Sequence, residues 1–92
     1  MNFQELDMPD LLAEVGVRVR AARLMVNLSQ EQLAREARVS RSTIKRLEGG
    51  TDSVSLSNLL AVLKTLDCID MFVNALPEPE HSRQRASRTM GY

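Results

Sequence analysis

Residues 28–50 of the 92-residue chain read LSQEQLAREARVSRSTIKRLEGG, and this stretch predicts two short helices joined by a tight turn. Ser29 and Ser40 each stand where a side-chain oxygen caps the first turn of a helix. In the second helix Ile44 and Leu47 are three residues apart, so they share a face that can be buried. The opposite face carries polar and basic side chains, namely Arg41, Ser42, Lys45 and Arg46.

A helix that buries one side and presents arginine, serine and lysine on the other suits the major groove of DNA, because that groove admits an α-helix. Arginine can bind O6 and N7 of guanine with two hydrogen bonds. We therefore predict a helix-turn-helix in which Arg41, Ser42 and Arg46 read bases and Lys45 contacts the backbone. Two alternatives stay open: the arginines bind phosphate alone, or the face is simply solvated.

The stretch resembles the lambda-repressor/Cro type of helix-turn-helix, the XRE family, over residues 15–70. The resemblance implies an all-α, compact five-helix, lambda-repressor-like DNA-binding domain. Arg38 departs from the pattern, because the turn between the two helices usually has glycine; a left-handed arginine there costs about 1 kcal/mol. The matching residues are Leu28-Ser29-Gln30-Glu31, Leu33-Ala34, Val39-Ser40, Thr43-Ile44 and Leu47-Glu48-Gly49.

The flanking sequence predicts three more helices. A first helix enters at Pro9-Asp10 and runs to about Asn27, and Gly16 weakens its pattern only locally. Gly49-Gly50-Thr51 ends the third helix, Ser55 caps a fourth, and residues 69–76 form a short fifth segment. The expected buried positions are Leu12, Val15, Val19, Ala22 and Val26 in the first helix and Leu56, Leu59, Leu60, Leu63 and Leu66 in the fourth.

These helices define one domain, residues 10–76, after an N-terminal extension, residues 1–9. Residues 77–92 begin Pro-Glu-Pro-Glu and continue as a polar, basic run. Such a segment buries too little apolar surface to offset the entropy of ordering it. We therefore expect a flexible, disordered C-terminal tail that can fold on a partner.

Composition argues against several other classes of protein. The single cysteine, Cys68, cannot form an internal disulfide, and it reads as a small buried hydrophobe. Neither a membrane-spanning run nor a signal peptide is evident, so we expect a cytoplasmic, prokaryotic protein associated with the nucleoid when bound. One histidine, His81, and one cysteine do not make a metal site, and we expect no enzyme activity, no catalytic residues and no cofactor.

The net charge is zero, but the charges are unevenly distributed along the chain. Residues 18–46 contain eight basic and two acidic side chains, whereas residues 1–17 and 47–81 are acidic and residues 82–92 are basic. The positive charge is concentrated where the motif lies, which favours a nucleic acid partner.

Further contacts follow partly from the residues and partly from the resemblance. Gln30 stands in the first turn of its helix, where amides favour a phosphate; it is alternatively just a helix former. The resemblance implies that Gln30 clamps phosphate or supports the recognition helix, and that Arg23 pairs with Glu48 and reaches phosphate. Two unrelated surface charges are the alternative for that pair. The other phosphate candidates are Ser40, Thr43 and, more weakly, Thr51 and Ser53.

Useful specificity requires two copies of so small a module, with half-sites about one helical turn apart. The apolar fifth segment supplies a candidate dimer interface, with Phe72 as the best anchor; alternatively, these residues only close the monomer core. We expect a homodimer. The candidate interface residues are Ile69, Met71, Phe72, Val73 and Leu76.

The resemblance implies a transcriptional repressor that binds double-stranded DNA at a palindromic operator. The layout also resembles HipB-type antitoxins, in which a compact domain and dimer end precede an acidic hinge and a basic tail. Such antitoxins repress their own operon and hold a kinase-like toxin. The alternatives are a stand-alone, phage or restriction-controller regulator, and an interaction module that has lost DNA binding.

Overall fold

The computed structural model describes residues 2–51 and 53–79. Within these ranges the chain is all-helical, which confirms the predicted fold class, and no helix there is both long and apolar enough to cross a membrane. Most of the predicted tail, residues 80–92, lies outside the described residues. The elements are a 3-10 helix, Phe3–Glu5, and α1 (Met8–Met25), α2 (Gln30–Ala37), α3 (Arg41–Glu48), α4 (Leu56–Thr65) and α5 (Ile69–Asn74).

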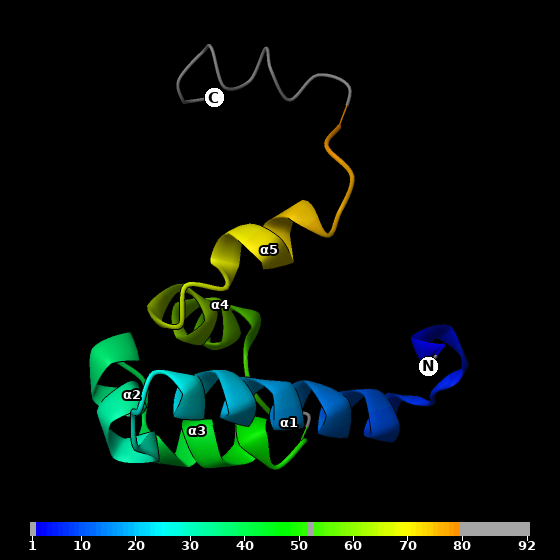
Figure 1. Ribbon diagram of the computed structural model, residues 1–92. Helices are drawn as coiled ribbons and strands as arrows, with labels where there is room; N and C mark the ends of the chain where they lie inside the picture. The colour runs from blue at the N-terminus through cyan, green and yellow to red at the C-terminus, as the bar shows by residue number, and fades with distance from the viewer. Residues whose placement is uncertain (1, 52, 80–92) are drawn as a thin grey trace.

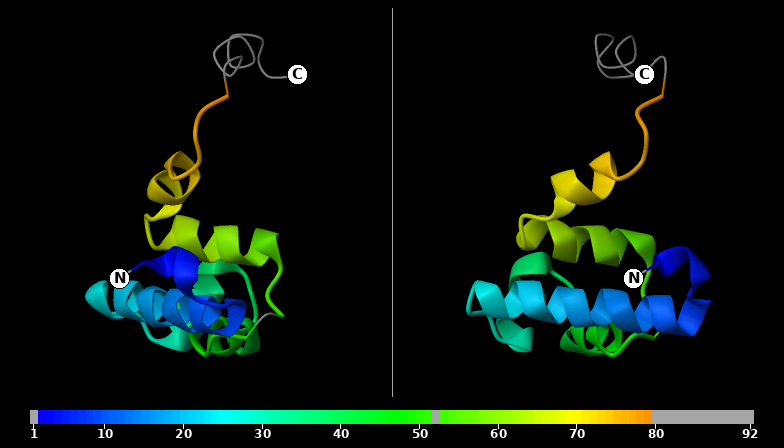
Figure 2. Two further views of the ribbon diagram at one scale, coloured as in Figure 1. Left: turned by 90° about the vertical axis from the view of Figure 1, so that its right-hand side faces the viewer. Right: turned by 45° about the vertical axis from the view of Figure 1, so that its right-hand side comes forward.

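The helices are stacked so that α3 and α5 lie at opposite ends of the molecule (Figures 1 and 2). The long helix α1 lies along α3, while α2 contacts both α3 and α4. Helix α5 packs against α4 on the side remote from α3 (Figure 1). The motif formed by α2 and α3 is therefore held by α1 and α4, and α5 is left at the periphery.

Serine side chains begin three of the helices, as predicted. Ser29 forms a capping box with Gln32: its Oγ accepts from the Gln32 amide at 3.0 Å, and Gln32 Oε1 accepts from the Ser29 amide at 2.8 Å. Ser40 Oγ accepts from the amide of Thr43 at 3.0 Å, and Ser55 Oγ accepts from that of Asn58 at 3.1 Å. These bonds satisfy orphan amides locally, which is why the sequence alone predicts them.

A left-handed residue follows the end of each of four helices, α1, α2, α3 and α4. Arg38 has φ 60° and ψ 43°, as predicted for the turn between α2 and α3. Asn27 and Asp67 also have φ 60°, which was not predicted, and Gly50 has φ 80°. Asparagine and aspartate tolerate this conformation better than most side chains, so the strain falls chiefly on Arg38.

The core lies between α1, α2, α3 and α4, and its fully buried side chains are Leu33, Ile44 and Val62. Two of the positions predicted to be buried in the first helix are wrong, because Val15 and Val26 are 42% and 50% exposed. Leu56, placed in the buried face of α4, is 65% exposed, whereas Val62 was not among the predicted core positions. Which apolar side chains of a helix are covered depends on its neighbours, and periodicity does not specify these.

Gly16 was interpreted as a local weakness of the first helix, and the structure corrects this. Gly16 is buried where α1 crosses the end of α3, and an added Cβ would lie 2.5 Å from the Glu48 carbonyl oxygen and 2.7 Å from that of Leu47. Both are backbone atoms, which cannot rotate away as a side chain can. Gly16 therefore allows α1 to approach α3 closely.

Candidate DNA-binding surface

Helix α3 separates its residues into two faces. Ile44 and Leu47 are 0% and 7% exposed and anchor the helix in the core. On the other side Arg41, Ser42 and Lys45 are exposed, as predicted. The core contacts therefore fix the orientation of α3 and turn a basic surface outward. Arg46 is half-buried at the edge of this surface.

The guanidinium of Arg46 folds back along its own helix. Its Nη1 donates to Ser42 Oγ at 3.0 Å, and its Nη2 donates to Thr43 Oγ1 at 3.4 Å. Its Nε is buried and has no hydrogen-bond partner among the described residues. The side chain is thus held against α3 and does not extend freely from it.

Thr43, expected as a contact to the DNA backbone, is not on the exposed face of α3. Its side chain is buried, at 4% exposure, and its Oγ1 lies 2.9 Å from Ser40 Oγ. Ser40 itself is exposed, and its Oγ caps α3. The predicted contact residues at the start of α3 therefore divide into an exposed serine and a threonine beneath the surface.

Arg23 and Glu48 come together as the resemblance implied, and they form a buried ion pair. The Nε and Nη2 of Arg23 donate to the two carboxylate oxygens of Glu48 at 2.6 and 2.9 Å, and Nη1 donates to the Leu28 carbonyl at 2.8 Å. Only 8% and 4% of the two side chains are exposed. The bidentate pair ties the last turn of α1 to the last turn of α3.

The hydrogen bonds that Arg23 donates to Glu48 raise the pKa of Arg23 above its ordinary value. Burial opposes this shift, and the negative charge of Glu48 adds a smaller increase in the pKa. A raised pKa of a basic group means that its charged form is favoured in the folded state. The contribution of Arg23 to stability is thus complete below its unfolded-state pKa and is lost only as the pH rises through its still higher folded-state pKa. Arg23 consequently stays charged at every pH at which the protein would work.

Gln30 completes this arrangement from α2. Its Nε2 donates to Glu48 Oε1 at 3.1 Å, so the side chain of Gln30 supports the last turn of α3. Glu48 thereby accepts from residues of both α1 and α2, a convergence that spacing along the chain does not reveal. Thr51, in the loop after α3, is exposed and donates its hydroxyl to the Arg46 carbonyl at 3.1 Å.

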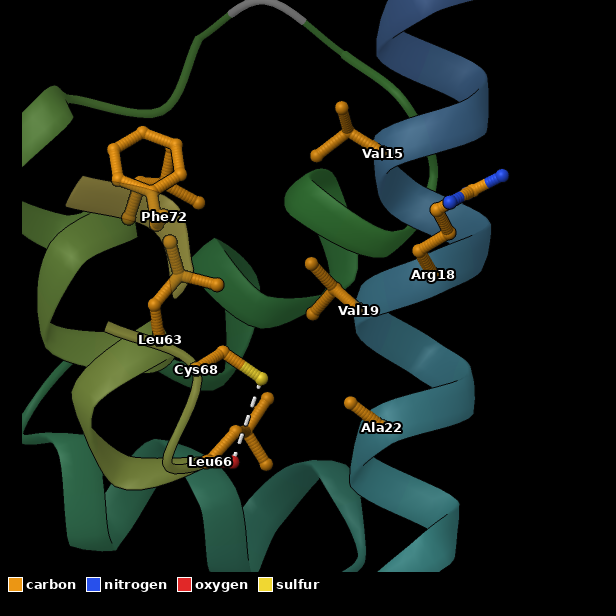
Figure 3. A pocket seen from close by; sticks show the side chains of 9 residues that line it. Val15, Arg18, Val19, Ala22, Leu63, Leu66, Cys68 and Phe72 are labelled. Carbon is orange, nitrogen blue, oxygen red and sulfur yellow. Dashed lines mark hydrogen bonds between the residues drawn. The ribbon is translucent and has the colours of Figure 1, made fainter. Parts of the chain in front are cut away.

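The candidate dimer residues lie on α5 and just after it. Ile69 is half-buried, and Phe72 is 40% exposed and lines an apolar cavity of about 160 Å³ between α1, α4 and α5. Figure 3 shows Phe72 across this cavity from Val15 and Val19 of α1. Cys68, at the same cavity, is half-buried, and its Sγ approaches the Leu66 carbonyl. The remaining candidates are exposed: Met71, Val73 and Leu76.

Comparison with known proteins agrees with this geometry. A family model described as helix-turn-helix matches residues 19–71, which include α2, α3 and α4. The chain belongs to this helix-turn-helix family, of the XRE type. It is also 40% identical over 72 residues to an "uncharacterized transcriptional regulator in ATPase CF(0) region" from Rhodospirillum rubrum, an alignment that covers 75% of this chain and 67% of the relative.

Proposed function

We propose that this protein is a sequence-specific DNA-binding transcriptional repressor in which α3 enters the major groove. The observation that carries the proposal is the exposed basic face of α3, whose opposite face is anchored in the core of a helix-turn-helix domain. A helix held in this way presents its side chains to a groove in one fixed orientation. The relative from Rhodospirillum rubrum is described as a transcriptional regulator, which supports the same class.

The proposed contacts divide into base readers and phosphate contacts. Arg41, Ser42 and Arg46 read base edges, and Lys45 binds the backbone as a point charge. The exposed hydroxyls of Ser40 and Thr51 and the amides at the start of α2, beside Gln30, are further phosphate contacts. Arg23 supports DNA binding indirectly, through its ion pair with Glu48, because all three of its guanidinium nitrogens donate hydrogen bonds within the protein. Any contact between Arg23 and phosphate uses the remaining N–H groups of these nitrogens.

The experiment that tests the proposal is selection of bound duplexes from a random library at low and at moderate salt. We expect one sequence to be enriched at both concentrations. Phosphate contacts release counterions, so affinity for all duplexes falls with salt while the preference for the enriched sequence remains. Recovery of unselected DNA that is lost with salt would contradict sequence-specific binding and favour an interaction module.

Two variants on the same face separate the proposed roles. Arg41→Ala should lose about 1–3 kcal/mol of discrimination at one base pair per half-site, because it removes a bidentate contact. Lys45→Ala, the matched control, should weaken binding to all sequences about equally and reduce the dependence on salt. Competition titrations with single-base-pair variants of the enriched duplex measure both effects. A uniform loss for Arg41→Ala would show that it contacts phosphate.

We further propose a homodimer formed through α5, which would bind a palindromic operator. Met71, Val73 and Leu76 are 75%, 56% and 70% exposed, and apolar side chains gathered in this way favour burial against a partner. The position of α5 at the other end of the molecule from α3 leaves both surfaces accessible at once (Figure 2). Analytical ultracentrifugation at micromolar concentration should give a dimer for the wild type and a monomer for Met71→Glu. Glu31→Gln, at an exposed position of α2, is the control.

The antitoxin role with a kinase-like toxin remains a narrower proposal. It depends on residues 77–92, of which only 77–79 are described, and these are exposed. Co-purification of a kinase-like protein encoded beside the gene would support this role. A neighbouring restriction enzyme, or no co-purifying protein, would favour the controller or stand-alone regulator instead.

A further inference from the structure

The hydroxyl of Thr43 is a buried polar group on α3 for which direct contact with DNA offers no explanation. At 4% exposure it cannot reach a groove without a change in the helix. It lies between Ser40 Oγ, at 2.9 Å, and Nη2 of Arg46, at 3.4 Å. Thr43 is thus placed beneath the one arginine of the basic face that is half-buried.

After donating to Ser42 and Thr43, the Arg46 guanidinium still has free N–H groups for base recognition. A guanidinium has five N–H groups in a rigid, planar fork. Ser42 and Thr43 each accept one, from Nη1 and Nη2, and the Nε group is buried. By this count one N–H remains on each terminal nitrogen, and two neighbouring donors are what a bidentate contact with guanine requires.

We propose that Thr43 is a positioning residue: with Ser42 it holds the Arg46 guanidinium in place and so sets the base pair that Arg46 reads. This inference rests on the proposed function of α3. An arginine that is already ordered loses less side-chain freedom when it binds, and its fork is aimed in one direction. By contrast, the exposed side chain of Arg41 makes no hydrogen bond with another described residue.

Thr43→Val tests the proposal, because valine keeps the shape of threonine and removes the hydroxyl. We expect discrimination at the base pair read by Arg46 to fall about three- to tenfold, the effect of one hydrogen bond, with the Arg41 base pair unaffected. Thr43→Ser should restore the discrimination. Thr65→Val, which removes the hydroxyl that donates to the Ala61 carbonyl on α4, is the matched control and should change neither base pair. A thermal melt establishes that each variant folds, and Thr43→Ala replaces Thr43→Val where valine prevents folding.

A second readout needs no DNA. In the wild type the hydroxyl bonds should slow rotation about the Nε–Cζ bond of Arg46, so that its two terminal nitrogens give separate NMR signals. In Thr43→Val these signals should merge, and in Thr65→Val they should stay separate. Merged signals in the wild type, or equal losses at every base pair in Thr43→Val, would overturn the proposal. A wild type with separate signals but no selected sequence would instead refute the proposed DNA function.

Discussion

Replacing Gly16 with alanine should destabilise the protein, although the same change inside an exposed helix stabilises it by about 1 kcal/mol through helix propensity. The added Cβ would lie 2.5 Å from the carbonyl oxygen of Glu48, whereas ordinary contact begins near 3.4 Å. Helices α1 and α3 must then separate by about 0.9 Å, the difference between these two distances. Overpacking of this kind costs about 1–3 kcal/mol, and the upper end applies because the obstructing atoms are backbone.

After the gain in propensity is subtracted, we expect a net loss of about 2 kcal/mol. In a domain of this size that corresponds to a fall in Tm of roughly 8–16 °C. Thermal and urea unfolding of the wild type and Gly16→Ala measure it. Gly49→Ala is the matched control: a Cβ there meets its nearest neighbour, the Lys45 carbonyl oxygen, at 3.0 Å, so stability should change by less than about 1 kcal/mol. An unchanged or higher Tm for Gly16→Ala would refute the close approach of α1 and α3.

Three further predictions concern charge and the turn. Glu48→Gln removes the charged partner of a buried arginine, so it should lower the free energy of unfolding in urea by about 3 kcal/mol or more. Glu14→Gln, in the exposed pair with Arg18, should lower it by less than about 1 kcal/mol. Equal losses would contradict the burial of the pair between Arg23 and Glu48. Arg38→Gly should raise the free energy of unfolding by up to about 1 kcal/mol, because glycine removes the left-handed strain. The gain is limited because glycine loses more conformational entropy on folding. A lower free energy of unfolding would show that the turn is not strained. A hydrogen bond with Asp7, and secondarily the negative charge of Asp7, raise the pKa of Asp10, so the folded state gains stability from this group at low pH and loses it as the pH rises through the folded-state value. Asp7→Asn should lower the Asp10 midpoint in an NMR titration, and an unchanged midpoint would contradict the coupling.

The elements of the motif could be predicted because their causes are local. Ser29, Ser40 and Ser55 cap helices through amides only three residues away, and the spacing of Ile44 and Leu47 separates the two faces of α3. The exposed positions of Arg41 and Lys45 follow from the same spacing.

Other positions could not be predicted, because they depend on which helix lies next to which. Thr43 was expected near DNA but is covered by its neighbours, and Val15 was expected in the core but borders a cavity. The resemblance paired Arg23 with Glu48 and gave Gln30 a role in clamping phosphate or supporting the recognition helix. That both residues donate to one carboxylate appears only when three helices are assembled.

The sequence by itself determined the helices, their serine caps and the basic face of α3, since each follows from interactions within one or two turns of the chain, and the resemblance implied the left-handed turn at Arg38. The tertiary structure alone decided that Gly16 is a contact between helices, that Val62 is fully buried and that Thr43 lies beneath Arg46. The physical reason is that burial and backbone approach are properties of pairs of elements. Residues far apart in the chain set them, and no local pattern records which elements meet.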